Sequence, residues 1–240
     1  MDAVSGRPTR PAAPDAEPGV PAELKVEIWS DVVCPWCYIG KRRIETALEG
    51  FEHRVEVEVQ YRSFELNPDA PKDEGGGLAD RLARKYGVSL EQAKAMNARV
   101  SETAAEEGLK YNLDIARPGN TFDAHRLIHL AATEGRQAEM QERLMAAYFV
   151  EGKPIGDSET LVELAAELAI DPDRARKALH SNEFATDVRA EEEEAGRLGI
   201  SGVPFFVIDR RYGVSGAQPA ELLARALDQA WSEARSAEPA

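Results

Sequence analysis

The feature that most constrains the fold of this chain is a cysteine pair placed directly after a short strand-like segment. Residues 24–28 alternate between apolar and charged side chains, a pattern typical of a half-buried β-strand. The only two cysteines of the 240 residues, Cys34 and Cys37, follow and are separated by Pro35 and Trp36. Such a pair can be a reversible disulfide, half of a metal site, or two residues of the core.

The residues after the first cysteine predict an amphipathic helix over 35–50 that ends at Gly50. Pro35 suits the first position of that helix, which places Cys34 at the N-cap. Unpaired backbone N–H groups and the positive end of the helix dipole favour a thiolate there. We therefore expect a lowered pKa and an exposed, nucleophilic Cys34. Cys37 lies on the apolar stripe of the helix, so we expect it to be the more buried, resolving thiol.

The remaining segments predict a β-α-β unit, a helical block and a final β-β-α unit. Residues 55–61 alternate as a second strand, which we expect to run parallel to the first. Helical periodicity extends from about residue 77 to 198. The apolar run 203–208 and residues 210–214 predict a hairpin, followed by a closing amphipathic helix. We interpret the four glutamates at 191–194 as a solvated helix face.

Charge and composition exclude several classes of partner. A net charge of −14 disfavours nucleic acid and anionic membranes, because both would be repelled. No apolar segment approaches the length needed to cross a bilayer. The proline-rich residues 1–22 lack the apolar region of a secretory signal and predict a disordered tail. We therefore expect a cytoplasmic protein, a setting in which structural disulfides are rare and catalytic cysteine pairs are favoured.

A zinc site is the first alternative to a redox pair. His125 and His129 have the spacing of a ligand pair, and with Cys34 and Cys37 they could formally supply four ligands. Compact zinc modules separate such pairs by about a dozen residues, whereas residues 38–124 intervene here. A cysteine pair of this spacing next to a β-α-β pattern favours redox chemistry, so we expect no metal.

Two motifs far apart in the chain resemble those of a known family. Cys34-Pro-Trp-Cys37 and the later 202–204 segment, Gly-Val-Pro, resemble the thioredoxin fold as elaborated in the DsbA family. Residues 29–41 and the segment NTFDAHR at 120–126 resemble the FrnE-like branch of that family. The resemblance covers about residues 24–235 of the chain.

The resemblance implies an α/β architecture, namely a thioredoxin fold with a large α-helical insertion. We expect residues 23–65 and 186–240 to form the thioredoxin-like domain. Residues 66–185 are then the helical insertion domain, and residues 1–22 the disordered tail.

The resemblance also implies how the site is completed. The peptide bond between Val203 and Pro204 is expected to be cis, which brings the chain close to the sulfur atoms. Pro204 then joins the two cysteines as a catalytic residue. Val203 offers backbone groups to an extended substrate, and we expect Pro35 and Trp36 to contact the substrate as well.

One position departs from the pattern of the family. Relatives often carry a buried acid six residues before the nucleophile, and that position is Ile28 here. Asp31 lies nearby in the expected loop, where a carboxylate would oppose thiolate formation. His125 becomes a candidate substrate contact and proton acceptor if the insertion folds over the site; ordinary packing is the alternative.

The predicted function is that of a thiol–disulfide oxidoreductase acting on protein or small-molecule thiols and disulfides. It needs no cofactor beyond its own disulfide; glutathione is a candidate co-substrate, and the sequence does not identify the partner that recycles the pair. One alternative is a glutathione-dependent isomerase or transferase, like kappa-class transferases and 2-hydroxychromene-2-carboxylate isomerases, which typically have serine at the position of Cys34. Another is a peptide-binding chaperone without turnover.

Overall fold

The computed structural model describes residues 24–236, so the predicted tail at 1–22 lies outside the described residues. This part of the chain contains four strands and nine α-helices, together with a short 3₁₀ turn at Arg54–Glu56. Between residues 24 and 236 no helix has both the length and the apolarity needed to span a membrane. The elements, in chain order, are β1 (Leu24–Ser30), α1 (Pro35–Glu49), β2 (Val57–Ser63), α2 (Leu78–Tyr86), α3 (Leu90–Glu106), α4 (Phe122–Ala132), α5 (Gln137–Phe149), α6 (Ser158–Glu167), α7 (Pro172–His180), α8 (Ala185–Arg197), β3 (Phe205–Ile208), β4 (Tyr212–Ser215) and α9 (Ala220–Ser236).

The four strands form one mixed sheet in the order β2-β1-β3-β4. β1 and β2 are parallel, with Ile28 opposite Tyr61, as predicted for a β-α-β unit. β3 is antiparallel to β1, with Phe206 opposite Ile28, and the predicted hairpin joins it to β4. The thioredoxin-like α/β fold is thereby confirmed. β1 has a neighbour on both sides, which fixes the position of the loop that follows it.

Two strand boundaries differ from the prediction. The second strand begins at Val57, because residues 54–56 form the 3₁₀ turn, and Val55 is 55% exposed instead of facing the core. β3 begins at Phe205, two residues into the predicted run. Proline has no N–H group for a strand ladder, so Pro204 ends the loop before β3 and is not part of the strand.

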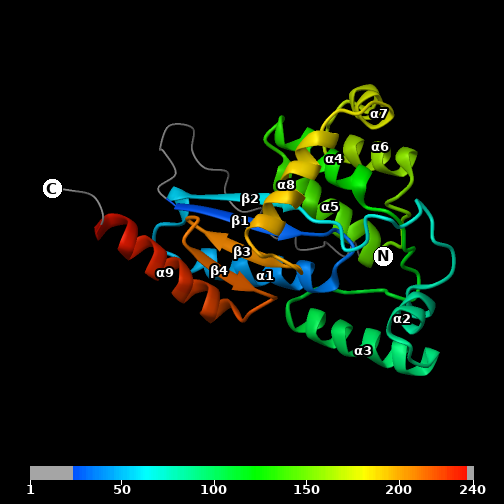
Figure 1. Ribbon diagram of the computed structural model, residues 1–240, viewed down its shortest axis with the longest axis horizontal. Coiled ribbons are helices and arrows are strands. Elements are labelled where there is room, and N and C mark those ends of the chain that lie inside the picture. The colour runs from blue at the N-terminus through cyan, green and yellow to red at the C-terminus, as the bar shows by residue number, and fades with distance from the viewer. Residues whose placement is uncertain (1–23, 237–240) are drawn as a thin grey trace, which may run out of the picture.

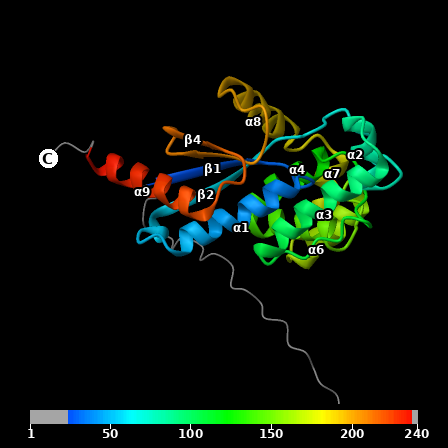
Figure 2. The same cartoon turned by 90° about the horizontal axis from the view of Figure 1, so that it is seen from below.

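The two faces of the sheet are covered by different helices (Figures 1 and 2). α1 and α9 cover one face, and α8 covers the other. The side chains of β1 and β3 alternate between these faces, as expected for strands buried on both sides. The cluster toward α1 and α9 includes Val26, Ile28, Ile44, Phe206, Ile208, Leu223 and Leu227. The cluster toward α8 consists of Trp29, Ala195, Ile200 and Val207.

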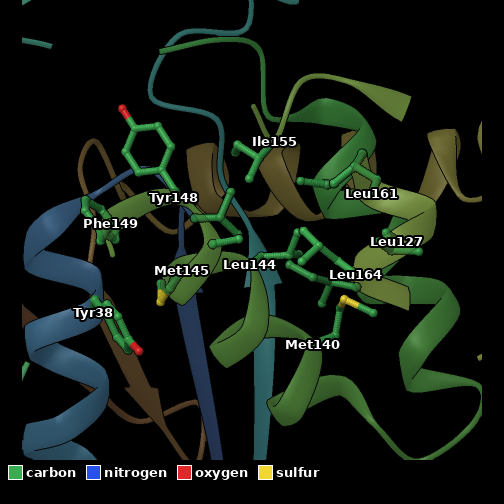
Figure 3. Close-up of a cluster of buried hydrophobic side chains, with 14 of the residues drawn as sticks. Tyr38, Leu127, Met140, Leu144, Met145, Tyr148, Phe149, Ile155, Leu161 and Leu164 are labelled. Atoms are coloured by element: carbon green, nitrogen blue, oxygen red, sulfur yellow. The ribbon is translucent and has the colours of Figure 1, made fainter. Parts of the chain in front are cut away.

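Helices α2 to α7 lie beyond one end of the sheet (Figure 1) and fall within residues 66–185, the predicted insertion, whose boundaries remain a prediction. Their core is built around α5, and Tyr38 of α1 packs into the same cluster (Figure 3). Cys34 and Cys37 belong to this cluster too. The cysteine motif is therefore packed into the core that joins α1 to the helical insertion. The α5 residues of this core are Met140, Leu144, Met145, Tyr148 and Phe149.

The glutamate run of α8 is not a solvated face throughout. Glu191 is only 6% exposed and accepts a hydrogen bond from the Ser63 backbone N–H at 2.7 Å. Its carboxylate also lies 2.8 Å from the Arg62 guanidinium and 3.1 Å from His129. The prediction was wrong for Glu191 because α8 packs on β2, where one acid of the run meets partners that the local sequence does not show. Glu193 does remain exposed.

Candidate active site

The cysteine motif lies where the loop after β1 turns into α1. Cys34 is the N-cap, with φ −87° and ψ 112°, and Pro35 occupies the first turn of the helix. The Cys34 N–H donates to the Asp31 carbonyl at 3.1 Å, and the Cys37 N–H donates to the Cys34 carbonyl at 3.0 Å. α1 ends at Glu49, as predicted from the glycine that follows. The sequence thus predicted both ends of this helix.

The predicted exposure of Cys34 is wrong. Both cysteines are free thiols, and the exposed fractions are 4% for Cys34 and 2% for Cys37. The Cys34 side chain accepts no hydrogen bond from the helix N-terminus. Its thiol instead donates to the Val203 carbonyl at 3.5 Å, so the loop before β3 covers the sulfur. Only Trp36, at 44% exposure, reaches far into solvent from between the two cysteines.

Cys37 has the environment of a thiol that keeps its proton. Burial, together with the neighbouring Cys34 sulfur, raises the pKa of the Cys37 thiol well above its usual value. The Asp31 backbone and the Ser30 hydroxyl partly oppose this rise in pKa. A buried, protonated thiol attacks poorly. This environment suits the resolving role that the sequence predicts for Cys37.

The loop before β3 contains the expected cis peptide bond between Val203 and Pro204. Gly40 of α1 makes a close approach to it: a Cβ at this position would lie 2.9 Å from the Pro204 Cγ and 3.3 Å from the Phe206 ring. Glycine therefore lets the helix and the loop touch. Gly40 lies in the segment 29–41, but its packing role was not predicted, although its position one turn after Cys37 signals a residue on the packed side of α1.

Tyr111, in the segment between α3 and α4, contacts the cysteine motif, and no sequence pattern predicted this contact. Its hydroxyl donates to the Pro35 carbonyl at 2.7 Å, and its ring lies 4.7 Å from that of Phe149 and 6.0 Å from that of Tyr38. Burial raises the pKa of Tyr111, so the hydroxyl remains a donor. The insertion thus holds the first turn of α1. A surface cavity of about 490 Å³ adjoins this tyrosine; it is lined by Lys94, Asn97, Ala98, Ser101, Tyr111, Asn112, Leu113 and Asp114.

His125 contacts the loop that leads into the cysteine motif and is buried there. α4 carries the imidazole to Asp31, where Nε2 lies 3.4 Å from Oδ1, and both residues are 1% exposed. Asp31 lies in the loop after β1, as expected, and its Oδ2 accepts from the Leu66 N–H at 2.8 Å. The imidazole is therefore closed off from any substrate in this structure. Ile28 is buried in the sheet core, so no acid stands at that position of the strand.

The zinc alternative finds no geometric support. His125 faces Asp31, whereas His129 lies against Glu191 and 3.2 Å from the Ser63 hydroxyl. Across the described residues, no group of three or more His, Cys, Asp or Glu side chains gathers in a way that could hold a metal ion.

The sequence and this geometry agree with one known family. The model of the DSBA-like thioredoxin domain matches residues 25–228. The chain belongs to this family. This DsbA-family chain has the thioredoxin-like sheet, the helices inserted after β2 and the cysteine pair at the start of α1.

Individual relatives agree with the family match. A "probable DsbA oxidoreductase" from Streptomyces coelicolor is 47% identical and superposes with a TM-score of 0.85, over 90% of this chain and 92% of that one. The uncharacterized protein YwbO of Bacillus subtilis is 27% identical over 77% of this chain and 86% of its own. A 2-hydroxychromene-2-carboxylate isomerase shares the fold, with a TM-score of 0.67 at 13% identity, over 90% of this chain and 100% of that one.

Proposed function

We propose that this DsbA-family protein is a thiol–disulfide oxidoreductase of the FrnE-like branch, acting on protein or small-molecule thiols through Cys34 and Cys37. The observation that carries the proposal is the pairing of two thiols at the start of α1 with the cis Val203–Pro204 bond, which the Cys34 thiol contacts through the Val203 carbonyl. The S. coelicolor relative, described as a probable DsbA oxidoreductase, supports it.

In the oxidising direction, a substrate thiolate attacks the Cys34 sulfur of the Cys34–Cys37 disulfide. The new bond joins the substrate to Cys34, and the old bond breaks so that Cys37 leaves as a thiolate and takes up a proton. A second substrate thiolate then attacks the first substrate sulfur and releases the Cys34 thiolate. Two electrons have moved from two substrate thiols to the cysteine pair. The reducing direction runs these steps backward, with Cys34 attacking and Cys37 resolving.

The surroundings of the pair suit an extended thiol substrate. Trp36 presents an exposed apolar surface beside Cys34, and Pro35 fixes the start of the helix on which it stands. Val203 is half-buried, and in the proposed complex its backbone pairs with the substrate while Pro204 keeps the chain close to the sulfur. When the disulfide forms, Cys34 has no thiol hydrogen left, so the Val203 carbonyl loses this hydrogen bond and is free to accept another. We propose a cytoplasmic protein that uses thiols and disulfides as partners.

Glutathione-dependent isomerisation is the enzymatic alternative, because a 2-hydroxychromene-2-carboxylate isomerase has the same fold. A resemblance at that level of identity shows the fold alone. The alternative gives no use for Cys37, whose buried thiol lies one helical turn from Cys34. The exchange reaction uses both thiols and is therefore preferred.

Substitution of the two cysteines, one at a time, tests the proposal. Cys34→Ser is expected to abolish insulin reduction and the oxidation of a dithiol peptide, because the attacked sulfur is gone. Cys37→Ser is expected to accumulate a mixed disulfide between Cys34 and the substrate, since no resolving thiol remains. A peptide-binding chaperone would instead keep its anti-aggregation activity in both variants and show no turnover in the unmodified protein. Glutathione-dependent isomerisation without disulfide turnover would refute the proposal.

A further inference from the structure

A buried acid–base pair includes a residue of the loop that leads into the cysteine motif. Asp31 and His125 are each 1% exposed, and the Asp31 Oδ1 lies 3.4 Å from the His125 Nε2. Neither of these two atoms makes a hydrogen bond. An ionised group buried without a partner is costly, so the carboxylate and the imidazole depend on each other for charge compensation. Tyr148 of α5 stands near Asp31 as a neutral group, because burial raises its pKa and the aspartate adds to the rise.

The pair is joined to the cysteines through the backbone of Asp31. Its carbonyl accepts the Cys34 N–H at 3.1 Å, which closes a turn over residues 31–34. The Cα atoms at the two ends of such a turn are within about 7 Å of each other. The Asp31 backbone also interacts with the Cys37 sulfur. The Asp31 side chain thus belongs to the residue whose backbone holds the Cys34 N–H, in a buried setting where salt screens charges poorly.

Charges from three other segments meet at His125. Besides Asp31 in the loop after β1, these are Glu65 in the loop after β2 and Glu192 of α8. Arg189 of α8 pairs with both glutamates, at 2.5 Å in each case, and so compensates part of their charge. Burial alone lowers the pKa of His125, but the close contact with the Asp31 carboxylate, with the charges of Glu65 and Glu192, outweighs it and leaves the pKa above its ordinary value.

We propose that His125 is a positioning residue whose imidazolium cancels the Asp31 carboxylate beside Cys34, so that the helical insertion sets the reduction potential of the cysteine pair. The inference rests on the proposed function, because it requires exchange between dithiol and disulfide. Reduction breaks the Cys34–Cys37 bond with two electrons from two substrate thiolates, and leaves Cys34 as thiolate and Cys37 as thiol. An uncompensated Asp31 carboxylate opposes that thiolate; the imidazolium removes the opposition.

Linkage gives this arrangement a definite dependence on pH. If the imidazolium favours the Cys34 thiolate, the thiolate must raise the pKa of His125 by the same factor. Reduction then takes up an additional fraction of a proton at pH values near that pKa. The compensation is complete while His125 is charged, below its pKa, and is lost as the pH rises through it. The reduction potential therefore falls more steeply with pH in that range than the cysteines alone require.

The unmodified protein supplies the first test. The pKa of His125 is measured by NMR in the oxidised and the reduced form, and His125→Gln assigns its signal among the four histidines. A unit charge that appears nearby in a buried site changes an ionisation equilibrium by about tenfold or more. We expect the pKa of His125 to be about one unit higher in the reduced form. An identical pKa in the two forms overturns the inference.

Variants supply the second test, through equilibrium with glutathione redox buffers. His125→Gln is expected to make the disulfide about tenfold harder to reduce, which corresponds to about 30 mV. The double variant Asp31→Asn/His125→Gln is expected to return to the unmodified value, because the opposing charge is gone as well. His129→Gln is the matched control, because the His129 imidazole is on the same helix but its partner is Glu191. This variant should leave the reduction potential unchanged.

The outcomes separate the inference from the function on which it rests. A double variant that keeps the shift of His125→Gln, or a single variant without any shift, contradicts the inference alone. If Cys34 and Cys37 form no disulfide in the unmodified protein, the proposed function fails first. If His125→Gln does not fold, the NMR titration of the unmodified protein still decides the question.

Discussion

Replacing Gly40 by alanine should press α1 against the loop that covers Cys34. An added Cβ would lie 2.9 Å from the Pro204 Cγ and 3.3 Å from the Phe206 ring, and both partners are part of the packed core. Overpacking of this kind costs about 1–3 kcal/mol. Alanine in a helix is favoured over glycine by about 1 kcal/mol, which offsets part of the cost. We therefore expect Gly40→Ala to lose up to about 2 kcal/mol of unfolding free energy.

Gly196→Ala in α8 is the matched control, because a Cβ there meets nothing within 4 Å. This substitution should gain about 1 kcal/mol from helix propensity alone. Urea unfolding followed by tryptophan fluorescence measures both variants, and the two unfolding free energies should differ by about 1–3 kcal/mol. In a chain of this size, each kcal/mol corresponds to about 2–4 °C in Tm.

The same substitution should slow thiol exchange. The Cys34 thiol contacts the Val203 carbonyl at 3.5 Å, so displacing the loop changes the surroundings of the attacked sulfur. Insulin reduction by Gly40→Ala should fall below that of the unmodified protein, whereas Gly196→Ala should retain full activity. If Gly40→Ala is stabilised as much as the control and is equally active, the close approach of α1 and the proline loop is refuted.

Two further predictions concern buried charged side chains. His129 and Arg62 lower the pKa of Glu191 to about 2 despite its burial, so its contribution to stability is present above pH 4.5 and is lost as the pH falls toward 2. Glu191→Gln should therefore flatten the acid limb of the unfolding curve, and Glu193→Gln should not; equal acid limbs would contradict the buried pairing. Arg126 donates to the carbonyls of Leu179, Ser181 and Glu183 at the end of α7, so Arg126→Lys should lose roughly 2–4 kcal/mol by urea unfolding. Arg176 on α7 is far less buried than Arg126, so Arg176→Lys should leave the urea midpoint unchanged. An equally unchanged midpoint for Arg126→Lys would refute the stabilising role of its hydrogen bonds to the end of α7.

The sequence predicted those parts of the fold that depend on nearby residues. Pro35 and Gly50 bound α1, and the alternation of apolar residues in β1 and β2 indicated two neighbouring strands. These features follow from backbone preferences within a few positions of the chain. The cis bond before Pro204 followed from the resemblance to the DsbA family and is confirmed.

The parts that were missed depend on contacts between distant segments. Cys34 is covered by Val203, which lies 169 positions away, and no local pattern reports that contact. The burial of Glu191 arises in the same way, from the packing of α8 on β2. The sequence singled out His125 within the segment 120–126, but its partner Asp31 is fixed only when α4 packs against the loop after β1.

Cys34 and Cys37 should form one reversible redox couple. To test this, the unmodified protein is equilibrated in glutathione buffers, free thiols are trapped by alkylation, and the products are weighed by mass spectrometry. We predict a two-electron transition between a Cys34–Cys37 disulfide and the dithiol, at a potential between those of thioredoxin, about −270 mV, and DsbA, about −120 mV. Two thiols that remain free in every oxidising buffer would refute the redox couple.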